Sequence, residues 1–450
     1  MIKGQFAANT LILTLVSAAL QLIGLAFQIY LTNRIGAGVT GLFFLVMSVG
    51  SFAATFAISG ARFAGARLVS EELGLENGRG ALSAVYKCFL YSSAFGAASM
   101  LLLYFGAEFI GGRLIGDVRC VLSLKVLAFG MPFFSMGAVL YGYLTARKSA
   151  VKLAAIQFFE QAVRIAATLA ALSAVNPGDA EKACAAGILG FTASEAAGFF
   201  ISLAMFLPER RLLSRSGRKE AGMWGRILGI APPLALSAYM RTALSAVCNI
   251  MIPRALRVYG AGAEGALASY GTIQGMAMPV VAFPMALFAS IAEMLVPELT
   301  DAQVKRQTQR IRKFVSALLR LCLLISAALM CVLFCFSGAF GRIFYGSAEA
   351  GRYIRAFSLL APLLYLDAVT DGMLRGLGEQ LYAMRVNVAD SLLSLVLISV
   401  LLPRFGTAGY IAVMYFTEIF NFSLSFYRLS KTVFREKRQS AALAIENGKP

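Results

Sequence analysis

Histidine is absent from the 450 residues of this chain. Because histidine is the usual proton-transfer group near neutral pH and the commonest metal ligand, its absence excludes His-based catalysis, His metal sites and His proton relays. Cysteine is scarce, with seven residues, and almost all of them lie inside apolar segments. Cysteines in that setting indicate small core residues rather than a disulfide framework or zinc ligands. We therefore expect no metal site and no cofactor.

Charged residues are also few, at 14% of the chain against about 25% in soluble domains. Hydrophobic residues make up 59%, which is typical of a membrane protein in contact with lipids. The net charge of +18 does not point to nucleic acid, because the basic residues sit between apolar segments instead of forming a patch on a soluble fold. We exclude nucleic acid as a partner.

Apolar segments long enough to cross about 30 Å of hydrocarbon occur twelve times. The first follows Lys3 without a small-residue cleavage pattern, so we interpret it as a spanning helix rather than a removed signal peptide. The sequence therefore predicts an all-α membrane protein with about twelve transmembrane helices, six in each half. The predicted spans are residues 7–32, 38–60, 81–106, 119–143, 152–174, 184–207, 227–252, 264–296, 314–336, 354–377, 383–402 and 406–427.

The loops predict the orientation and the lobe boundaries. Most lysines and arginines fall in the loops on the side that carries the amino terminus, and by the positive-inside rule both termini are cytoplasmic. The longest basic loop lies at the midpoint of the chain. The predicted parts are an N-terminal six-helix lobe (1–212), a basic cytoplasmic linker (213–226), a C-terminal six-helix lobe (227–433) and a polar cytoplasmic tail (434–450).

An internal repeat supports the division into halves. The stretch 141–165 recurs in altered form about 230 residues later, and the alignment places Gly142 on Gly372, Gln157 on Asn387 and Glu160 on Asp390. A second, shorter match relates 66–73 to 292–299. Internal repeats of half the chain are typical of transporters whose lobes work against each other around a central site.

Polar residues inside the predicted spans are the candidates for function, because an ionisable group at a bilayer centre costs at least about 2.5–3.5 kcal/mol and normally faces a cavity or a partner. Gln157, Glu160 and Arg164 share one helix face in the fifth span at spacings i, i+3 and i+7. They indicate either a gate or ion-coupling site, or a structural ion pair between Glu160 and Arg164.

A comparable polar group lies in the tenth and eleventh spans. Asp367 and Asp371 are followed by Asn387 and Asp390, and clustered oxygens suit a coupling cation. We expect coupling to a monovalent cation or a proton here. The alternative is a structural role in which Arg375, one turn after Asp371, neutralises it.

Arg241 lies in the seventh span and has no carboxylate within one turn on either side. A guanidinium fork suits phosphate or carboxylate, so Arg241 is a candidate for binding an anionic substrate; a structural role with Glu293 is the alternative. Four amides in the spans suit sugar hydroxyls but are equally able to join helices. These amides are Gln21, Gln28, Asn249 and Gln274.

Five stretches in order resemble one family. They are QLIGLAFQIYLTNRIGAGVTGLF, RLVSEEL, FEQAVRI, YGTIQGMAMPVVAFPMALFASIAEMLVPEL and APLLYLDAVTDGMLRGLG. The ordered set is similar to the polysaccharide transport family, in its stage V sporulation protein B-like branch, within the multidrug/oligosaccharidyl-lipid/polysaccharide (MOP) exporter superfamily. The resemblance covers about residues 5 to 430.

The resemblance implies two six-helix lobes around a V-shaped central cavity in a bacterial plasma membrane. It implies a flippase or exporter of lipid-linked oligosaccharide or polysaccharide precursors, for the cell envelope or for spore peptidoglycan. Several relatives carry arginines in the first span where this chain has Gln21 and Gln28. We therefore expect Arg241, and also Arg62, to supply the positive charge for the diphosphate.

Two other functions stay open. A cation-coupled multidrug exporter of the same superfamily would need a carboxylate deep in a lobe, and the candidates Asp367 and Glu160 lie near predicted helix ends. A membrane-embedded saccharide ligase would need a large outer loop with a catalytic base, whereas the predicted outer loops are short. A transporter that is not an enzyme remains the main prediction.

Overall fold

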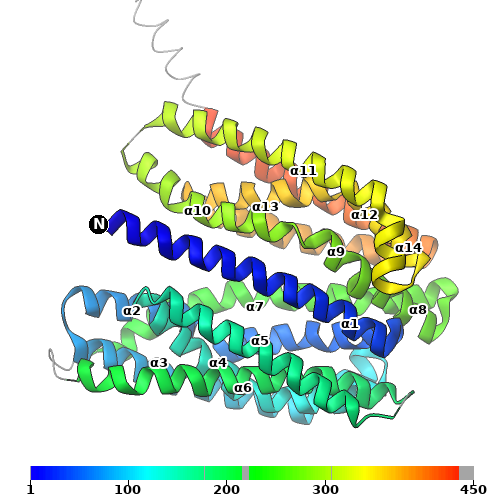
Figure 1. The fold of residues 1–450 in the computed structure, drawn as a ribbon, viewed down its shortest axis with the longest axis horizontal. Helices are drawn as coiled ribbons and strands as arrows, with labels where there is room; N and C mark the ends of the chain where they lie inside the picture. The colour runs from blue at the N-terminus through cyan, green and yellow to red at the C-terminus, as the bar shows by residue number, and fades with distance from the viewer. Residues whose placement is uncertain (1, 177, 215–221, 306, 435–450) are drawn as a thin grey trace, which may run out of the picture. The chain divides into compact units, whose positions relative to one another are not determined.

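The computed structural model describes residues 2–176, 178–214, 222–305 and 307–434, and nearly all of them are helical (Figure 1). The predicted tail from residue 435 and half of the predicted linker, residues 215–221, lie outside the described residues. The helices are α1 (Ile2–Ile58), α2 (Ala61–Gly74), α3 (Gly78–Phe109), η1 (Ile110–Ile115), η2 (Val118–Cys120), α4 (Val121–Ala146), α5 (Ala150–Ser173), α6 (Ala180–Leu213), α7 (Met223–Leu256), η3 (Arg257–Ala261), α8 (Gly262–Gly271), η4 (Thr272–Ala277), α9 (Met278–Ala282), α10 (Met285–Val304), α11 (Thr308–Tyr345), α12 (Ala348–Ser358), α13 (Ala361–Gly376) and α14 (Gln380–Phe434).

Three glycines separate predicted spans that are continuous helical segments in the structure. Gly36 (φ 82°), Gly260 (φ 108°) and Gly406 (φ 59°) interrupt the helical geometry within α1, η3 and α14. Glycine adopts positive φ without the steric cost that a Cβ brings, so the chain changes direction at these positions. They coincide with the predicted breaks after the first, seventh and eleventh spans.

The described part of the chain contains seven segments long and apolar enough to cross a membrane, and α12 with α13, bent by 53° at their junction, would form an eighth. Three of the seven, Ala18–Gly74, Met223–Ala282 and Gln380–Val433, each contain two predicted spans. The fifth predicted span is α5, whose polar residues lower its hydropathy. The twelve predicted spans are consistent with this arrangement.

One predicted loop is helical. Residues 61–80 were expected to form a cytoplasmic loop, but α2 occupies Ala61–Gly74. A short left-handed turn at Ser59 (φ 45°) and Gly60 (φ 75°) separates α2 from α1. The spans were predicted from apolar composition, so the helix with exposed Arg62 and Arg67 was left out of them; the assignment of these arginines to the cytoplasmic side stays a prediction.

The chain forms two compact units. Unit 1 comprises Met1–Arg254 and Gly262–Gly271, and unit 2 comprises Ala255–Ala261 and Thr272–Pro450. Helix α7 therefore clusters with unit 1, although its residues were assigned to the C-terminal lobe by the loop pattern. The predicted lobe boundaries, at residues 212 and 227, state which helices move together during transport, and they stay a prediction.

Small residues and serine hydroxyls hold the helices of unit 1 together. A Cβ on Gly96 of α3 would lie 2.2 Å from the Ser135 hydroxyl of α4, and Ser92 donates a 2.7 Å hydrogen bond to the Ser135 carbonyl oxygen. Ser99 donates to the Ala53 carbonyl oxygen at 2.8 Å. Such contacts suit a membrane, where lipid is as apolar as the core and close backbone approach drives helix association.

Unit 2 has its own packed centre between α10 and α13. The rings of Phe288 and Tyr365 stack with centroids 4.8 Å apart. The buried Tyr365 hydroxyl donates to the Val281 carbonyl oxygen at 2.6 Å, so its polar atom is satisfied despite full burial.

The internal repeat has a structural counterpart. A Cβ on Gly142 would lie 2.5 Å from the Arg62 carbonyl oxygen and 3.4 Å from the Ala66 nitrogen. A Cβ on Gly372 would lie 2.5 Å from the Ala292 side chain. The two aligned glycines thus meet the beginnings of the two aligned short segments, one pair in each unit.

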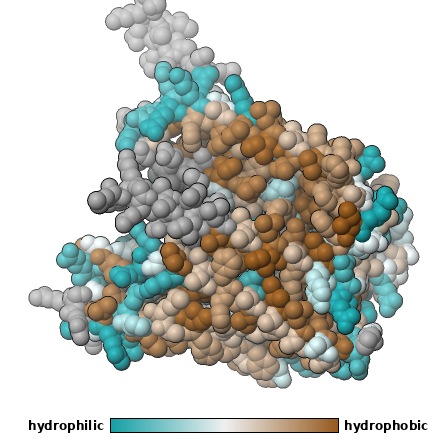
Figure 2. All heavy atoms as spheres, viewed as in Figure 1, coloured by the Kyte–Doolittle hydropathy of each residue, from teal (hydrophilic) through white to brown (hydrophobic). Residues whose placement is uncertain are grey.

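Hydropathy is distributed as a membrane protein requires. Figure 2 shows brown apolar side chains over the middle of the helices and teal polar side chains gathered toward helix ends. Many large apolar residues are exposed, for example Phe105, Leu324 and Ile343, and lipid rather than water is the solvent in which such exposure carries no penalty.

Candidate functional site

A polar pocket of about 210 Å³ lies inside unit 1, between α2, α4, α5 and α6. Arg62, Tyr141, Gln157, Glu160 and Glu195 provide its polar lining. The Arg62 guanidinium lies 5.7 Å from the centre of the Tyr141 ring, and Tyr141 and Glu160 line the same pocket. The structure therefore brings together three residues that the sequence placed in two separate candidate sites.

Two glycines make room for this pocket. The left-handed residue Gly60 immediately precedes Ala61, the first residue of α2, and so sets the position of Arg62. On α6, a Cβ at Gly198 would lie 1.8 Å from a Glu160 carboxylate oxygen. Only glycine leaves space for that carboxylate at the helix contact.

Arg164 does not form the predicted ion pair with Glu160. Its Nη2 lies 3.9 Å from a Glu195 carboxylate oxygen on α6, its Nε is 3.4 Å from the Ser194 hydroxyl, and its guanidinium lies 5.0 Å from the Phe191 ring centre. The spacing rule was overridden because α6 packs along α5 and offers a carboxylate across the helix contact. Glu160 faces the pocket instead.

Arg241 is exposed on α7. No hydrogen bond or ion pair joins it to any residue in the part of the chain that the structure describes. The hydroxyl of the neighbouring Thr242 donates to the Ala238 carbonyl oxygen at 2.9 Å. Thr242 is therefore satisfied within its own helix rather than by the Arg241 guanidinium. The side chain of Glu293, the alternative partner, lies outside the described side chains.

The four amides divide into two kinds. Asn249 donates to the Ser48 hydroxyl at 3.1 Å and Gln274 to the Tyr410 hydroxyl at 3.1 Å, so both join helices within their own unit. Gln28 donates to Thr32 of the same helix at 3.1 Å, and Gln21 is exposed. Helix joining thus accounts for Asn249 and Gln274, while the first-span glutamines remain open to a ligand.

The acidic candidates of the second half gather within unit 2. Asn421 of α14 donates to Asp367 at 3.2 Å, and Asn387 donates to Asp371 at 3.4 Å. No ion pair links Asp371 to Arg375 in the described residues, so the predicted neutralisation does not take the form of a direct contact. Oxygen atoms of five residues are buried there without a hydrogen-bond partner: Asp367, Asp371, Asp390, Glu418 and Asn421. Across the described ranges, no three carboxylates or thiolates lie close enough together to hold a metal ion.

Comparison with known proteins finds similar sequences along most of the chain. The MatE family matches residues 233–400. Over 409 residues the chain is 22% identical to Stage V sporulation protein B of Bacillus subtilis (strain 168), covering 90% of this chain and 79% of that protein. In sequence, the chain therefore resembles the MatE family and Stage V sporulation protein B.

Solved structures agree on the fold of this chain. It is similar to a multidrug resistance MATE family transporter of the MOP superfamily in its inward-facing conformation, with a TM-score of 0.72, 14% identity and 96% coverage of both chains. It is also similar to the MATE multidrug transporter DinF-BH, with a TM-score of 0.64, 18% identity and 95% coverage of both chains.

Three residues of the candidate sites were missed in the sequence. Glu195 lies inside the predicted sixth span, and Glu418 and Asn421 lie inside the twelfth. The rule that an ionisable residue in a span marks a site would have found both glutamates. The spacing of Glu418 and Asn421, i and i+3, places them on one helix face and is the signal that could have found the pair.

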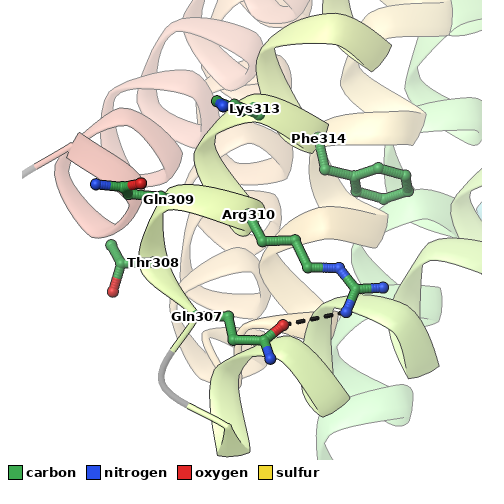
Figure 3. A pocket seen from close by; sticks show the side chains of 6 residues that line it. All are labelled: Gln307, Thr308, Gln309, Arg310, Lys313 and Phe314. Carbon is green, nitrogen blue, oxygen red and sulfur yellow. Dashed lines mark hydrogen bonds between the residues drawn. The ribbon is translucent and has the colours of Figure 1, made fainter.

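A larger cavity lies elsewhere in the described residues. A space of about 820 Å³ opens at the start of α11 in unit 2, where Arg310 donates to the Gln307 side chain at 3.1 Å (Figure 3). One short segment supplies all its lining, which is Gln307, Thr308, Gln309, Arg310, Lys313 and Phe314. It is an open surface recess at a basic helix start, and none of the candidate transport residues reaches it.

Proposed function

We propose that this protein is a transporter of the MOP superfamily that flips lipid-linked oligosaccharide or polysaccharide precursors across a bacterial plasma membrane by alternating access. The observation that carries the proposal is the exposed Arg241 on α7, a guanidinium without a partner among the described residues. Similarity to Stage V sporulation protein B along 90% of the chain supports it. Envelope or spore peptidoglycan synthesis is the pathway that fits such a substrate.

The chemistry of the substrate explains the need for arginine. A lipid-linked saccharide carries phosphate between its sugar and its lipid, so a flippase must offer a cation where the head group crosses. Arg241 has no carboxylate to compete with a phosphate, and a guanidinium binds phosphate oxygens two at a time. Arg62, in the unit 1 pocket, is the second candidate, although the Tyr141 ring already engages its guanidinium.

The acidic cluster of unit 2 is the candidate for coupling to a monovalent cation or a proton. Its carboxylates are partly balanced by amide donors rather than by arginine, and several of their oxygens are buried without a partner. A bound cation or proton would satisfy these oxygens. In unit 1, Arg164 lies against Glu195. Its guanidinium already supplies a positive charge to that carboxylate, so the acidic cluster of unit 2 is the better candidate for an ion site.

Cation-coupled multidrug export is the alternative. The fold is shared with structures of multidrug transporters, and the carboxylates of both units would attract a cationic drug. A membrane-embedded saccharide ligase is less well supported, because its outer-loop base has no counterpart in the sequence.

The two transport functions separate in proteoliposomes. The purified full-length chain is reconstituted with a fluorescent polyprenyl diphosphate oligosaccharide, and outer-leaflet accessibility of the label is followed under sodium or proton gradients. We expect gradient-dependent movement of this lipid, at least about tenfold faster than in vesicles without protein. Uptake of a cationic dye without lipid movement would support the drug exporter instead.

A further inference from the structure

Helix α7 is held in unit 1 by a small number of contacts. Much of its surface is exposed, including Leu228 (54%), Leu236 (62%) and Met240 (50%). Near its amino end Met223, Ile227 and Ala231 are fully buried, in a core shared with α2 and α3, and a few further residues, among them Ala235 and Ile252, are buried along the rest of the helix. A helix attached in this way depends on its polar contacts more than a helix with a broad buried face does.

The strongest polar contact lies at the amino end of α7. Arg226 Nη1 lies 2.6 Å from a Glu72 carboxylate oxygen and Nη2 lies 2.7 Å from a Glu71 carboxylate oxygen, so one guanidinium bridges the last turn of α2. Glu72 is 1% exposed. A Cβ on Gly80 would lie 2.1 Å from its Oε2, so the carboxylate is tightly enclosed.

A second contact lies further along α7. The Tyr239 hydroxyl donates to the Ser59 hydroxyl at 2.6 Å, and the Tyr91 hydroxyl lies 3.0 Å from the same Ser59 oxygen. Between these points, a Cβ on Gly60 would lie 2.4 Å from the Ala231 carbonyl oxygen of α7. Helix α7 therefore touches both the left-handed turn that precedes α2 and the far end of α2.

We infer that Arg226, with Tyr239, is a releasable latch that docks α7 on α2 in one state of the transport cycle and lets it go in the other. Helix α7 leads into the first crossing of the chain from unit 1 to unit 2, at Ala255, so its release is a step by which the two units move. Because the Ser59–Gly60 turn also positions Arg62, docking of α7 sets the geometry of the unit 1 pocket.

The partners of the latch make release reversible. When Arg226 leaves, Glu71 keeps its 2.9 Å ion pair with Arg67, and Glu72 keeps the 2.7 Å hydrogen bond from Asn77. Neither carboxylate is then stranded without any partner, which would be strongly destabilising for a buried charge. An ion pair that leaves both acids supported suits a contact that breaks in every cycle.

Distances between spin labels test the latch without any substrate, so failure here is distinguishable from failure of the proposed function. Labels are placed at Leu75→Cys, after α2, and Leu236→Cys, on α7, in full-length protein in nanodiscs, with the exposed Cys331 and Cys335 replaced by serine. We expect a main short component in the unsubstituted background. Arg226→Gln should shift at least half of that population to a longer, broader component.

Two further variants complete the test. Arg226→Gln with Glu72→Gln removes both charges, so it keeps the experiment decisive where the single variant misfolds; it should give the same shift. Arg67→Gln is the matched control, because it removes an ion pair of Glu71 without touching α7, and it should leave the distances unchanged. Unchanged distances in both well-folded Arg226 variants, or an equal shift in the control, would overturn the latch.

Discussion

Single side chains in this protein find partners that spacing along one helix does not predict. The sequence placed Glu160 and Arg164 one turn apart, and their shared face is correct, but Arg164 reaches across to Glu195 of the next helix. Likewise, the sequence shows Glu71 and Glu72 as two acids in a row, and only the fold brings Arg226 to them from 154 residues away. Sequence reasoning finds which residues are out of place in a membrane, but helix packing decides which of them meet.

The Arg164–Glu195 contact gives a stability prediction. Arg164→Ala leaves Glu195 without its cation, whereas adding Glu195→Gln removes the uncompensated charge. Breaking a buried pair costs about 3–5 kcal/mol, and we expect a smaller loss here because Arg164 keeps 34% side-chain exposure. Thermal unfolding in detergent should show a lower Tm for the single variant and partial recovery in the double variant.

Lys182→Ala provides the control, since it removes an exposed pair with Asp179 and should change the Tm little. A double variant that unfolds at the same temperature as Arg164→Ala would contradict the pairing. Recovery by Glu160→Gln instead of Glu195→Gln would return the pair to α5.

At the scale of elements, glycine determines much of what the sequence could and could not predict. Breaks at Gly36, Gly260 and Gly406 agree with the predicted span boundaries, because polar and turn-forming residues accompany them. The turn at Gly60 falls at the predicted end of the second span, residue 60, but the helix that follows it directly, α2, was not predicted. Its meaning depends on α7, which approaches Gly60 from a distant part of the chain.

The repeat-matched glycines give a prediction for this scale. Gly142→Ala places a Cβ 2.5 Å from the backbone of α2, and Gly372→Ala places one 2.5 Å from Ala292 of α10. Overpacking of this kind costs about 1–3 kcal/mol, more than the helix propensity gained by alanine, about 1 kcal/mol. Both variants should therefore unfold at lower temperature in detergent.

Gly225→Ala in α7 is the matched control, because no atom lies within 4 Å of its Cβ position. It should be neutral or slightly stabilising. Equal stability of all three variants would show that the close approaches at Gly142 and Gly372 relax without cost, and would remove the structural support for the repeat.

For the whole molecule, composition predicted the membrane fold, and the ordered motifs predicted the similarity to Stage V sporulation protein B and the fold shared with MATE transporter structures. The identity of the cargo is a different matter, because structures with this fold include multidrug transporters and fold alone does not select a substrate. In our account the cargo is selected by a few charges, above all by Arg241. The central claim is that this guanidinium binds the phosphate of a lipid-linked saccharide.

Transport by Arg241 variants in proteoliposomes tests that claim most directly, with movement of a fluorescent polyprenyl diphosphate oligosaccharide as the readout. The account predicts that Arg241→Ala nearly abolishes flipping and that Arg241→Lys weakens it, since a point charge replaces a two-pronged fork. Arg254→Ala, which removes an exposed arginine of the same helix, should retain transport. Loss of folding in Arg241→Ala would assign the residue to structure, and normal flipping by well-folded Arg241→Ala protein would contradict the account.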